Sequence, residues 1–264
     1  GMSGFEFIIP ERETSIGGFR VGRLLPSRQL RSVGPFVFID HMGPVTLSPE
    51  QNLDVLPHPH IGLSTLTWLM EGSILHRDSL GNDVEIQPGA VNWMTAGRGV
   101  VHSERTPGYL RNQTKALHGL QIWVALPAEL EETEPSFSHV EAKEIPSWEQ
   151  DGLRFRLIAG EIRGRKSHVP VNSKLYFLEI QSTTTCHLSL DRDFYGEKAI
   201  YLPEGMIRSG GEAFGPKQLL IPRADDFPEF ELAARTTLYV FGGEPLPEKR
   251  LMDWNFVSSR KGRL

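Results

Sequence analysis

Residues 54–68 read Asp54-Val-Leu-Pro-His-Pro-His-Ile-Gly-Leu-Ser-Thr-Leu-Thr-Trp68. One residue separates His58 from His60, and a proline precedes each of them. Proline disfavours helix interiors and is tolerated at the edge or end of a strand. Side chains at i and i+2 of a strand point to the same face, roughly 6.5–7 Å apart. The pattern therefore predicts two imidazoles at the end of one strand, placed to converge on a single ion.

A second pair with the same spacing is His102-Ser103-Glu104, which follows a glycine turn at Gly97-Arg98-Gly99. If the two strands face each other, three imidazoles and one carboxylate meet. This donor set, without a thiolate, is borderline and suits iron, manganese, nickel, copper or zinc. Four protein ligands leave two positions of an octahedron open, as a catalytic metal requires. A further pair, His76 and Asp78, alternates along Leu75–Ser79 and is expected to be exposed.

Short apolar runs bounded by glycine, proline, asparagine or aspartate recur along the chain, and helical periodicity is scarce. Many of the runs hold β-branched or aromatic residues, which is typical of an all-β sandwich or barrel. We expect strands over Phe36–Ile39, Leu63–Met70, Val84–Ile86, Leu120–Leu126, Leu153–Ile158, Lys174–Ile180, Lys198–Leu202, Gln218–Ile221 and Thr236–Phe241.

The length of 264 residues allows one large or two small domains. The stretch Pro127–Trp148 is rich in glutamate, contains three prolines and separates two strand-rich halves, which indicates a linker. We therefore predict two similar β domains, at residues 1–134 and 135–264, of which only the first carries metal ligands.

Composition excludes several classes of function. Net charge is −5, from 28 basic and 33 acidic residues, and the basic residues are scattered, so no direct nucleic-acid surface is expected. No apolar run approaches the roughly 18 residues of a membrane span, and no N-terminal signal is seen. The single cysteine, Cys186, allows no internal disulfide and suits a reducing cytoplasm.

The histidine spacing resembles that of the cupin family, a β-sandwich or small barrel that binds a metal through two motifs. The first motif is His-x-His-x(3,4)-Glu-x(6)-Gly; counted from His60, Thr65 takes the glutamate position and Gly72 the glycine position. The second motif, Pro-x-Gly-x(2)-His, matches Gly97–His102 with glycine in place of proline. Glu104 is then expected to replace the missing carboxylate from a different strand.

Longer strings resemble the pirin family more closely. They are Val33-Gly-Pro-Phe-Val-Phe-Ile-Asp-His-Met-Gly-Pro44, the stretch 54–68, Asn92-Trp-Met-Thr-Ala-Gly-Arg-Gly-Val-Val-His-Ser-Glu-Arg-Thr-Pro107, Leu117-His-Gly-Leu-Gln-Ile-Trp-Val-Ala-Leu-Pro127 and Trp254-Asn-Phe-Val-Ser-Ser259. The resemblance is dense over about residues 33–127 and thinner beyond. It implies two tandem cupin domains (double-stranded β-helix or jelly roll) with little helix.

The resemblance also implies one metal, described as iron, bound in the first domain by His58, His60, His102 and Glu104. We expect Fe(II), with manganese, nickel, copper, zinc or cobalt as alternatives. Some pirins resemble quercetin 2,3-dioxygenases, which implies a small aromatic or flavonoid-like substrate and O2. Glu104 would then act as general base on the substrate 3-hydroxyl, as a ligand, or as both.

The alternative hypothesis is a non-enzymatic, iron-binding regulatory protein that acts through a transcription or metabolic protein partner, because other pirins act as nuclear cofactors. Two departures from the family pattern bear on function. The C-terminal half has no His-x-His and no His-x-Glu, so no second metal is expected there. Family members often continue with a helix after Trp254–Ser259, whereas this sequence ends at Leu264, and a function that needs that helix is not expected.

Overall fold

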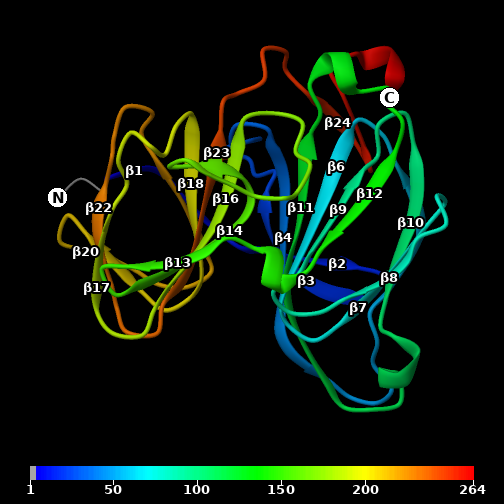
Figure 1. Ribbon diagram of the computed structural model, residues 1–264, viewed down its shortest axis with the longest axis horizontal. Coiled ribbons are helices and arrows are strands. Elements are labelled where there is room, and N and C mark those ends of the chain that lie inside the picture. Colours follow the sequence, from blue (N-terminus) through cyan, green and yellow to red (C-terminus); the bar gives the residue numbers. More distant parts are fainter. Residues whose placement is uncertain (1–3) are drawn as a thin grey trace. The chain divides into compact units, whose positions relative to one another are not determined.

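The regular secondary structure of the chain is almost entirely antiparallel β-strand, so the all-β prediction is confirmed (Figure 1). The computed structural model describes residues 4–264; residues 1–3, at the start of the predicted first domain, lie outside the described residues. Within the described residues none of the helices has the length and apolar character needed to span a bilayer. The helical elements there are the 3-10 turns η1 (Gly108–Leu110), η2 (Ala128–Leu130), η3 (Ala142–Glu144) and η4 (Lys261–Arg263).

The structure divides into two compact units, each built from segments distant in sequence. The first unit comprises Arg12–Leu25, Phe36–Glu144 and Leu246–Leu264. The second unit comprises the residues up to Glu11 together with Pro26–Pro35 and Ile145–Pro245. The division of the chain into domains 1–134 and 135–264 stays a prediction. In the structure, each terminal segment of the chain belongs to the unit that is formed mainly by the other half of the sequence.

The first unit pairs a seven-stranded sheet, in the order β12-β9-β6-β11-β4-β3-β2, with a four-stranded sheet, in the order β5-β10-β7-β8. A hairpin, β24-β25, completes it. Its strands are β2 (Arg12–Ile16), β3 (Phe19–Leu25), β4 (Phe36–Leu47), β5 (Asp54–His60), β6 (Leu63–Glu71), β7 (Ile74–Asp78), β8 (Asp83–Ile86), β9 (Val91–Thr95), β10 (Val100–Arg105), β11 (Lys115–Ala125), β12 (Ser136–Val140), β24 (Leu251–Asp253) and β25 (Phe256–Ser258).

The second unit repeats this plan with an eight-stranded sheet, β1-β21-β18-β23-β16-β14-β13 with β15 beside β14, and a four-stranded sheet, β17-β22-β19-β20. Its strands are β1 (Phe5–Pro10), β13 (Ser147–Gln150), β14 (Leu153–Ile162), β15 (Arg165–Lys166), β16 (Leu175–Ser182), β17 (Cys186–Ser189), β18 (Glu197–Glu204), β19 (Ile207–Ser209), β20 (Glu212–Phe214), β21 (Gln218–Pro222), β22 (Glu229–Leu232) and β23 (Thr237–Gly243).

Apolar side chains from the large and the small sheet of each unit pack into one core. In the first unit Leu69 of β6 joins Ile74 of β7 and Ile86 of β8. In the second, Leu178 of β16 packs in one cluster with Phe230 of β22. Two antiparallel sheets around a shared core form a double-stranded β-helix, and the predicted pair of cupin folds is confirmed. Each of the nine apolar runs expected to form strands overlaps an observed strand.

The acidic stretch Pro127–Trp148, predicted as a linker between the domains, contains the change from the first unit to the second, between Glu144 and Ile145, but much of it is folded structure. Residues Ser136–Val140 form β12, which pairs with β9 at the edge of the seven-stranded sheet. The strand reads Ser136-Phe-Ser-His-Val140 and holds only two apolar residues, so its sequence gives a weak strand signal. Glu131 in the same stretch is 1% exposed and bonds the C-terminal segment.

Candidate metal centre

The strands β5 and β10 bring the predicted histidines together. They pair antiparallel, with His102 opposite His58 and Val100 opposite His60. The register shifts between His102 and Glu104, so Leu56 and Pro57 of β5 lie opposite the single residue Ser103 of β10. Such a bulge re-aims side chains, and Pro57 and Pro59, which lack an N–H, are accommodated in this strand. The i, i+2 spacing thus places its two imidazoles against a third, as the sequence predicts.

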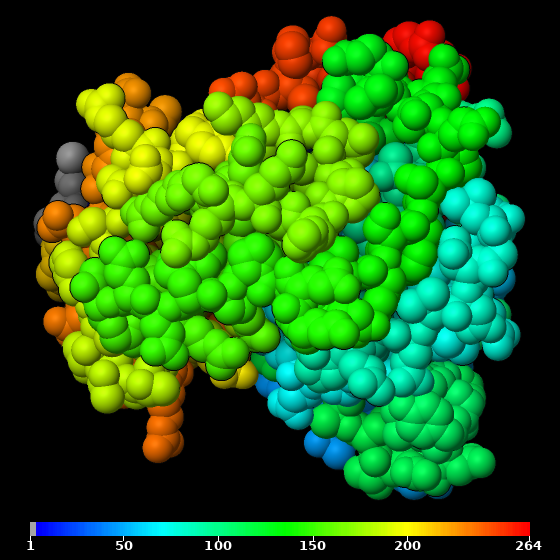
Figure 2. Space-filling view, in the orientation of Figure 1, coloured from blue at the N-terminus to red at the C-terminus, as the bar shows by residue number. Residues whose placement is uncertain are grey.

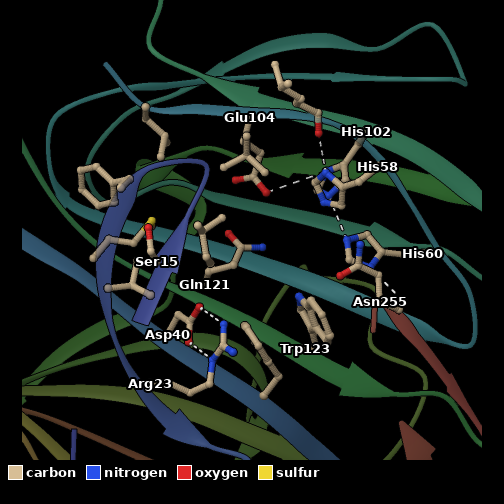
Figure 3. Close-up of a pocket in the computed structure, with 18 of the residues that line it drawn as sticks. Ser15, Arg23, Asp40, His58, His60, His102, Glu104, Gln121, Trp123 and Asn255 are labelled. Carbon is tan, nitrogen blue, oxygen red and sulfur yellow. Dashed lines mark hydrogen bonds and ion pairs between the residues drawn. The ribbon is translucent and has the colours of Figure 1, made fainter. Parts of the chain in front are cut away.

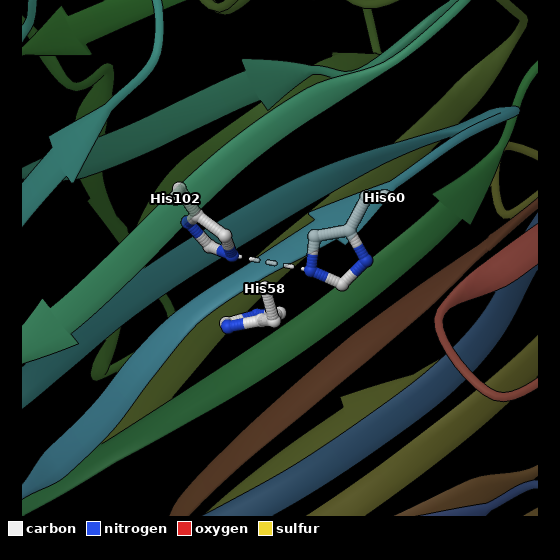
Figure 4. A group of neighbouring side chains, drawn as sticks. All are labelled: His58, His60 and His102. Atoms are coloured by element: carbon white, nitrogen blue, oxygen red, sulfur yellow. Dashed lines mark hydrogen bonds between the residues drawn. The ribbon is translucent and has the colours of Figure 1, made fainter.

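The three imidazoles form a compact group (Figure 4). One ligand atom from each of His58, His60 and His102 lies within 4.8 Å of the others. His60 Nε2 and His102 Nε2 lie 3.1 Å apart. His60 and His102 are buried, and His58 is half-buried. A group of this size is small enough for one ion to contact all three rings.

Hydrogen bonds on the far side of two rings fix which nitrogen faces the centre. His58 Nδ1 donates to the Leu56 carbonyl at 2.7 Å, and His60 Nδ1 donates to the Asn255 carbonyl at 3.1 Å. Each ring therefore keeps its Nε2 lone pair for the centre, as a backbone carbonyl partner does for metal-ligating histidines. His102 Nδ1 is buried and has no hydrogen-bond partner within the described residues.

The rings are held neutral, which metal ligation requires. Burial lowers the pKa of His60 to about 3, with a contribution from the neighbouring His58. Burial also lowers the pKa of His102 well below the ordinary value and, less strongly, that of His58. Neutral imidazole nitrogens converging without a thiolate fit a divalent transition metal. The residues present are therefore compatible with the metal that the sequence predicts.

Glu104 lies beside the three imidazoles rather than within their group. Its Oε1 is 3.8 Å from His102 Nδ1. The side chain is buried, and this burial raises the pKa of the carboxyl to about 7. The structure thus brings together three of the four predicted ligands. The role of Glu104 as the fourth ligand stays a prediction.

A pocket of about 560 Å³ opens onto this group (Figure 3). Its lining is mainly apolar and includes Phe19, Phe38, Met42, Leu53, Trp123 and Trp254. Pockets of roughly 300–1,000 Å³ with a few fixed polar groups are the usual sites for small molecules. The histidines and Glu104 form one polar part of this pocket.

A second polar part lies on β3, β4 and β11. Arg23 makes a two-pronged ion pair with the buried Asp40, at 2.8 and 3.0 Å. Gln121 accepts a hydrogen bond from Thr67 Oγ1 at 2.8 Å through its Oε1. The hydrogen bond fixes the Gln121 side chain at the wall of the pocket. Sequence reasoning missed these residues, which carry no local motif.

The turn of the β24-β25 hairpin contributes two more residues, Trp254 and Asn255. Asn255 is 195 residues from His60, to which its carbonyl is bonded. In the sequence, Trp254–Ser259 is distinguished only as a string that resembles the pirin family. That string is the one signal that pointed to this segment, and it said nothing of contact with a ligand.

The expected exposed pair His76 and Asp78 is present but buried, so its predicted exposure is wrong. His76 Nε2 lies 2.7 Å from Asp78 Oδ2, and His76 is 4% exposed. Its strand, β7, lies between β10 and β8 in the small sheet. The ring stacks on Phe137 and lies 5.4 Å from the His102 ring, centroid to centroid. The His76 ring therefore packs beside the His102 ring and helps to fix its position.

Comparison with known proteins identifies the family. A family model described as pirin matches residues 18–124, and one described as the pirin C-terminal cupin domain matches residues 177–264. The chain belongs to the pirin family. A pirin-like protein of Caulobacter vibrioides is 45% identical over 98% of this chain and 90% of its own length.

Solved structures agree with this pirin assignment. A crystal structure of quercetin 2,3-dioxygenase from Acinetobacter baumannii superposes with a TM-score of 0.90 and 34% identity, over 98% of this chain and 85% of that chain. The bacterial pirin YhhW from Escherichia coli, solved in complex with nickel(II), shares the fold with a TM-score of 0.68 and 17% identity, over 91% of this chain and 99% of that chain. A metal is thus found in a structure with this fold.

Proposed function

We propose that this pirin is a metal-dependent dioxygenase that opens the ring of a flavonol such as quercetin, in the manner of a quercetin 2,3-dioxygenase. One observation carries the proposal: three neutral imidazoles converge beside a buried carboxylate at a mainly apolar pocket. The similarity to the Acinetobacter baumannii quercetin 2,3-dioxygenase supports the choice of reaction.

We propose that His58, His60 and His102 hold one divalent metal, with Fe(II) as the expected ion and manganese, nickel, copper, zinc or cobalt as alternatives. The nickel complex of YhhW supports a metal in this fold. A bound metal of this kind supplies Lewis-acid polarisation of substrate oxygens and the one-electron chemistry that O2 requires. The low pKa values of the histidines keep their lone pairs available at neutral pH.

Glu104 is proposed as the general base that removes the proton of the flavonol 3-hydroxyl. A general base works best with a pKa near the operating pH, and burial raises the pKa of Glu104 to about 7. Its position beside the imidazoles, rather than among them, also supports this role. The predicted role of Glu104 as a fourth ligand is compatible with a side chain that shifts between the two.

The remainder of the pocket suits an aromatic substrate with oxygens at its edge. Phe38 and Trp123 stack on one another at 4.0 Å between centroids and present flat apolar surface. The Gln121 side-chain amide at the pocket wall could donate a hydrogen bond to a carbonyl or phenol oxygen. Apolar walls exclude water from the reacting centre, which strengthens electrostatic interactions there.

Oxygen uptake with quercetin tests the proposal. Iron-loaded protein is expected to consume O2 as quercetin disappears, and Glu104→Gln is expected to lower the rate by about 100-fold or more, as loss of a general base does. Glu134→Gln, at an exposed residue paired with Arg98, is the matched control and should leave the rate unchanged. Full turnover by metal-containing Glu104→Gln would contradict the base role.

An absence of O2 uptake after loading with iron, nickel, manganese or copper would contradict the dioxygenase proposal. That result would favour the alternative predicted from the sequence, a metal-binding regulatory protein that acts through a protein partner. The cytoplasmic location and the lack of direct nucleic-acid binding likewise stay predictions from composition.

A further inference from the structure

The turn of the β24-β25 hairpin has an unusual backbone. Trp254 and Asn255 join the two strands, in which Asp253 pairs with Phe256. Trp254 has a φ of 53°. This left-handed conformation brings Cβ close to the following carbonyl oxygen, so it is routine for glycine and rare for a bulky residue. Glycine would fit the same turn without strain.

The exposure of the Trp254 side chain to solvent is also unfavourable in free energy. It is 64% exposed and lines the pocket at the candidate metal centre. A ring contact with Phe256, at 5.4 Å between centroids, covers part of it. Leu56, which is likewise 64% exposed, lines the same pocket. Two large apolar side chains therefore lie at the solvent-accessible part of a pocket whose other apolar walls include the buried Phe19, Phe38 and Trp123.

The base of the hairpin is firmly attached, so the exposed tryptophan is held in place. Val257 N–H donates to the Ile61 carbonyl at 3.1 Å, and His60 Nδ1 donates to the Asn255 carbonyl. The backbone at Gly62 packs so closely on the Val257 carbonyl that a Cβ there would lie 1.7 Å from its oxygen. Figure 3 shows Asn255 directly beside His60. Trp254 is thus one residue from a support of the metal centre.

We propose that Trp254 is a substrate-binding residue whose indole packs on an aromatic ring of the substrate at the pocket mouth. Strain of this kind persists where function or the surrounding structure maintains it. An exposed indole beside an apolar pocket gains buried area and an aromatic contact when a flat ring enters. The inference rests on the proposed function, because a flavonol supplies that ring.

The test is calorimetric titration of iron-loaded protein with quercetin under anaerobic conditions, which measures binding without turnover. Trp254→Phe should bind within about threefold of the parent, because a ring remains. Trp254→Ala and Trp254→Gly should each bind at least about tenfold more weakly, since they lose the aromatic contact. Metal content, measured in every variant, should stay unchanged because the Asn255 carbonyl belongs to the backbone.

Thermal unfolding tests the strain separately. Trp254→Gly should melt about 2–4 °C above Trp254→Ala, because glycine adopts the left-handed conformation more easily. Arg235, an exposed turn residue with a φ of 58° in the second unit, is the matched control. Arg235→Gly should also melt above Arg235→Ala, while both bind quercetin as the parent does.

The outcomes separate this inference from the proposed function. Parent-like quercetin binding by Trp254→Ala and Trp254→Gly would overturn the role of Trp254 and leave the dioxygenase proposal standing. A parent protein that binds no quercetin would overturn both. Equal melting temperatures for the glycine and alanine variants would overturn the claim that Trp254 is held against its backbone preference.

Discussion

Glu104 and the three histidines beside it differ in how far sequence spacing could place them. The positions of His58 and His60 follow from strand geometry alone, because i and i+2 share a face. His102 is added by the pairing of two strands. Glu104 has the same i, i+2 spacing from His102, and its Oε1 lies 3.8 Å from His102 Nδ1, yet it lies outside the group formed by the three imidazoles. Spacing within one strand predicts a shared face, but it does not predict how far each side chain reaches toward the group.

The pH dependence of turnover should report on Glu104. Since the general base must be deprotonated, kcat/KM should rise about tenfold per pH unit below the pKa of Glu104 and level off above it. Burial places that pKa at about 7 in the absence of a metal, and a bound cation would move the limb to lower pH. The rising limb should be missing in Glu104→Gln. A limb that persists in the variant would assign the titration to another group.

The stability of the metal-free protein should also depend on pH through the Glu104 carboxyl. The folded-state pKa of Glu104, about 7, lies above its ordinary value of 4.5. Its contribution to stability is therefore fully present below pH 4.5 and is lost as pH rises through 7. At about 1.4 kcal/mol per pKa unit, Glu104→Gln should gain roughly 3 kcal/mol on the parent between pH 4.5 and 8.

Urea unfolding of both proteins with a chelator measures this difference. The histidines titrate alike in the parent and the variant, so their effect cancels in the comparison. A stability difference that does not change with pH would show that the Glu104 carboxyl is not desolvated as the structure indicates.

Among the strands, those of the C-terminal segment show that local sequence patterns do not predict which part of the molecule a strand joins. Apolar runs located nine of the strands, since alternation and apolar runs are local properties. The attachment of β24-β25 to the first unit depends on bonds such as that between Asn255 and His60, 195 residues apart. The space-filling view shows the red C-terminal residues against green surface near residue 130 (Figure 2), where Arg260 pairs with Glu132 at 3.2 Å.

Glu131 attaches this C-terminal segment to the first unit, and its replacement should lower the free energy of unfolding. It accepts hydrogen bonds from Ser258 Oγ at 3.2 Å and from the Ser259 N–H, and lies 3.6 Å from Arg250 Nε. Glu131→Ala leaves a guanidinium that is 7% exposed without its buried partner. We expect a loss of about 3–5 kcal/mol in the free energy of unfolding.

The neighbouring Glu132 provides the matched control for Glu131. Its side chain is 57% exposed and pairs with Arg260 and Arg263 at the surface. Exposed ion pairs contribute about 0–1 kcal/mol, so Glu132→Ala should change the free energy of unfolding by no more than that. Equal losses in the two variants, measured by urea unfolding, would contradict the anchoring role of Glu131.

At the scale of the whole molecule, the sequence predicted the two cupin folds but not their interleaving. The N-terminal strand β1 pairs with β21 in the second unit, where Phe5 lies opposite Pro222. Residues 246–264 return to the first unit. Strand pairing over such separations is decided by which sheet edge is open, and an apolar run does not encode its partner.

Truncation tests whether the metal centre depends on this return of the chain. Ending the chain after Pro245 removes the Asn255 carbonyl that orients His60, and loss of such a support lowers metal affinity about 10- to 100-fold. Ending it after Ser259 keeps Asn255 and the bonds to Glu131, so affinity should stay near the parent value. Competition with a chelator measures both, and parent-like affinity in the shorter protein would contradict the role of the hairpin.

The central claim is that His58, His60 and His102 hold one catalytic metal, and elemental analysis tests it most directly. The purified protein, or protein reconstituted anaerobically with Fe(II) and desalted, should contain close to one transition metal ion per chain. His60→Ala should contain little, since one of three converging imidazoles is lost. Metal-free protein after reconstitution, with all three histidines intact, or equal metal in His60→Ala, would contradict the account.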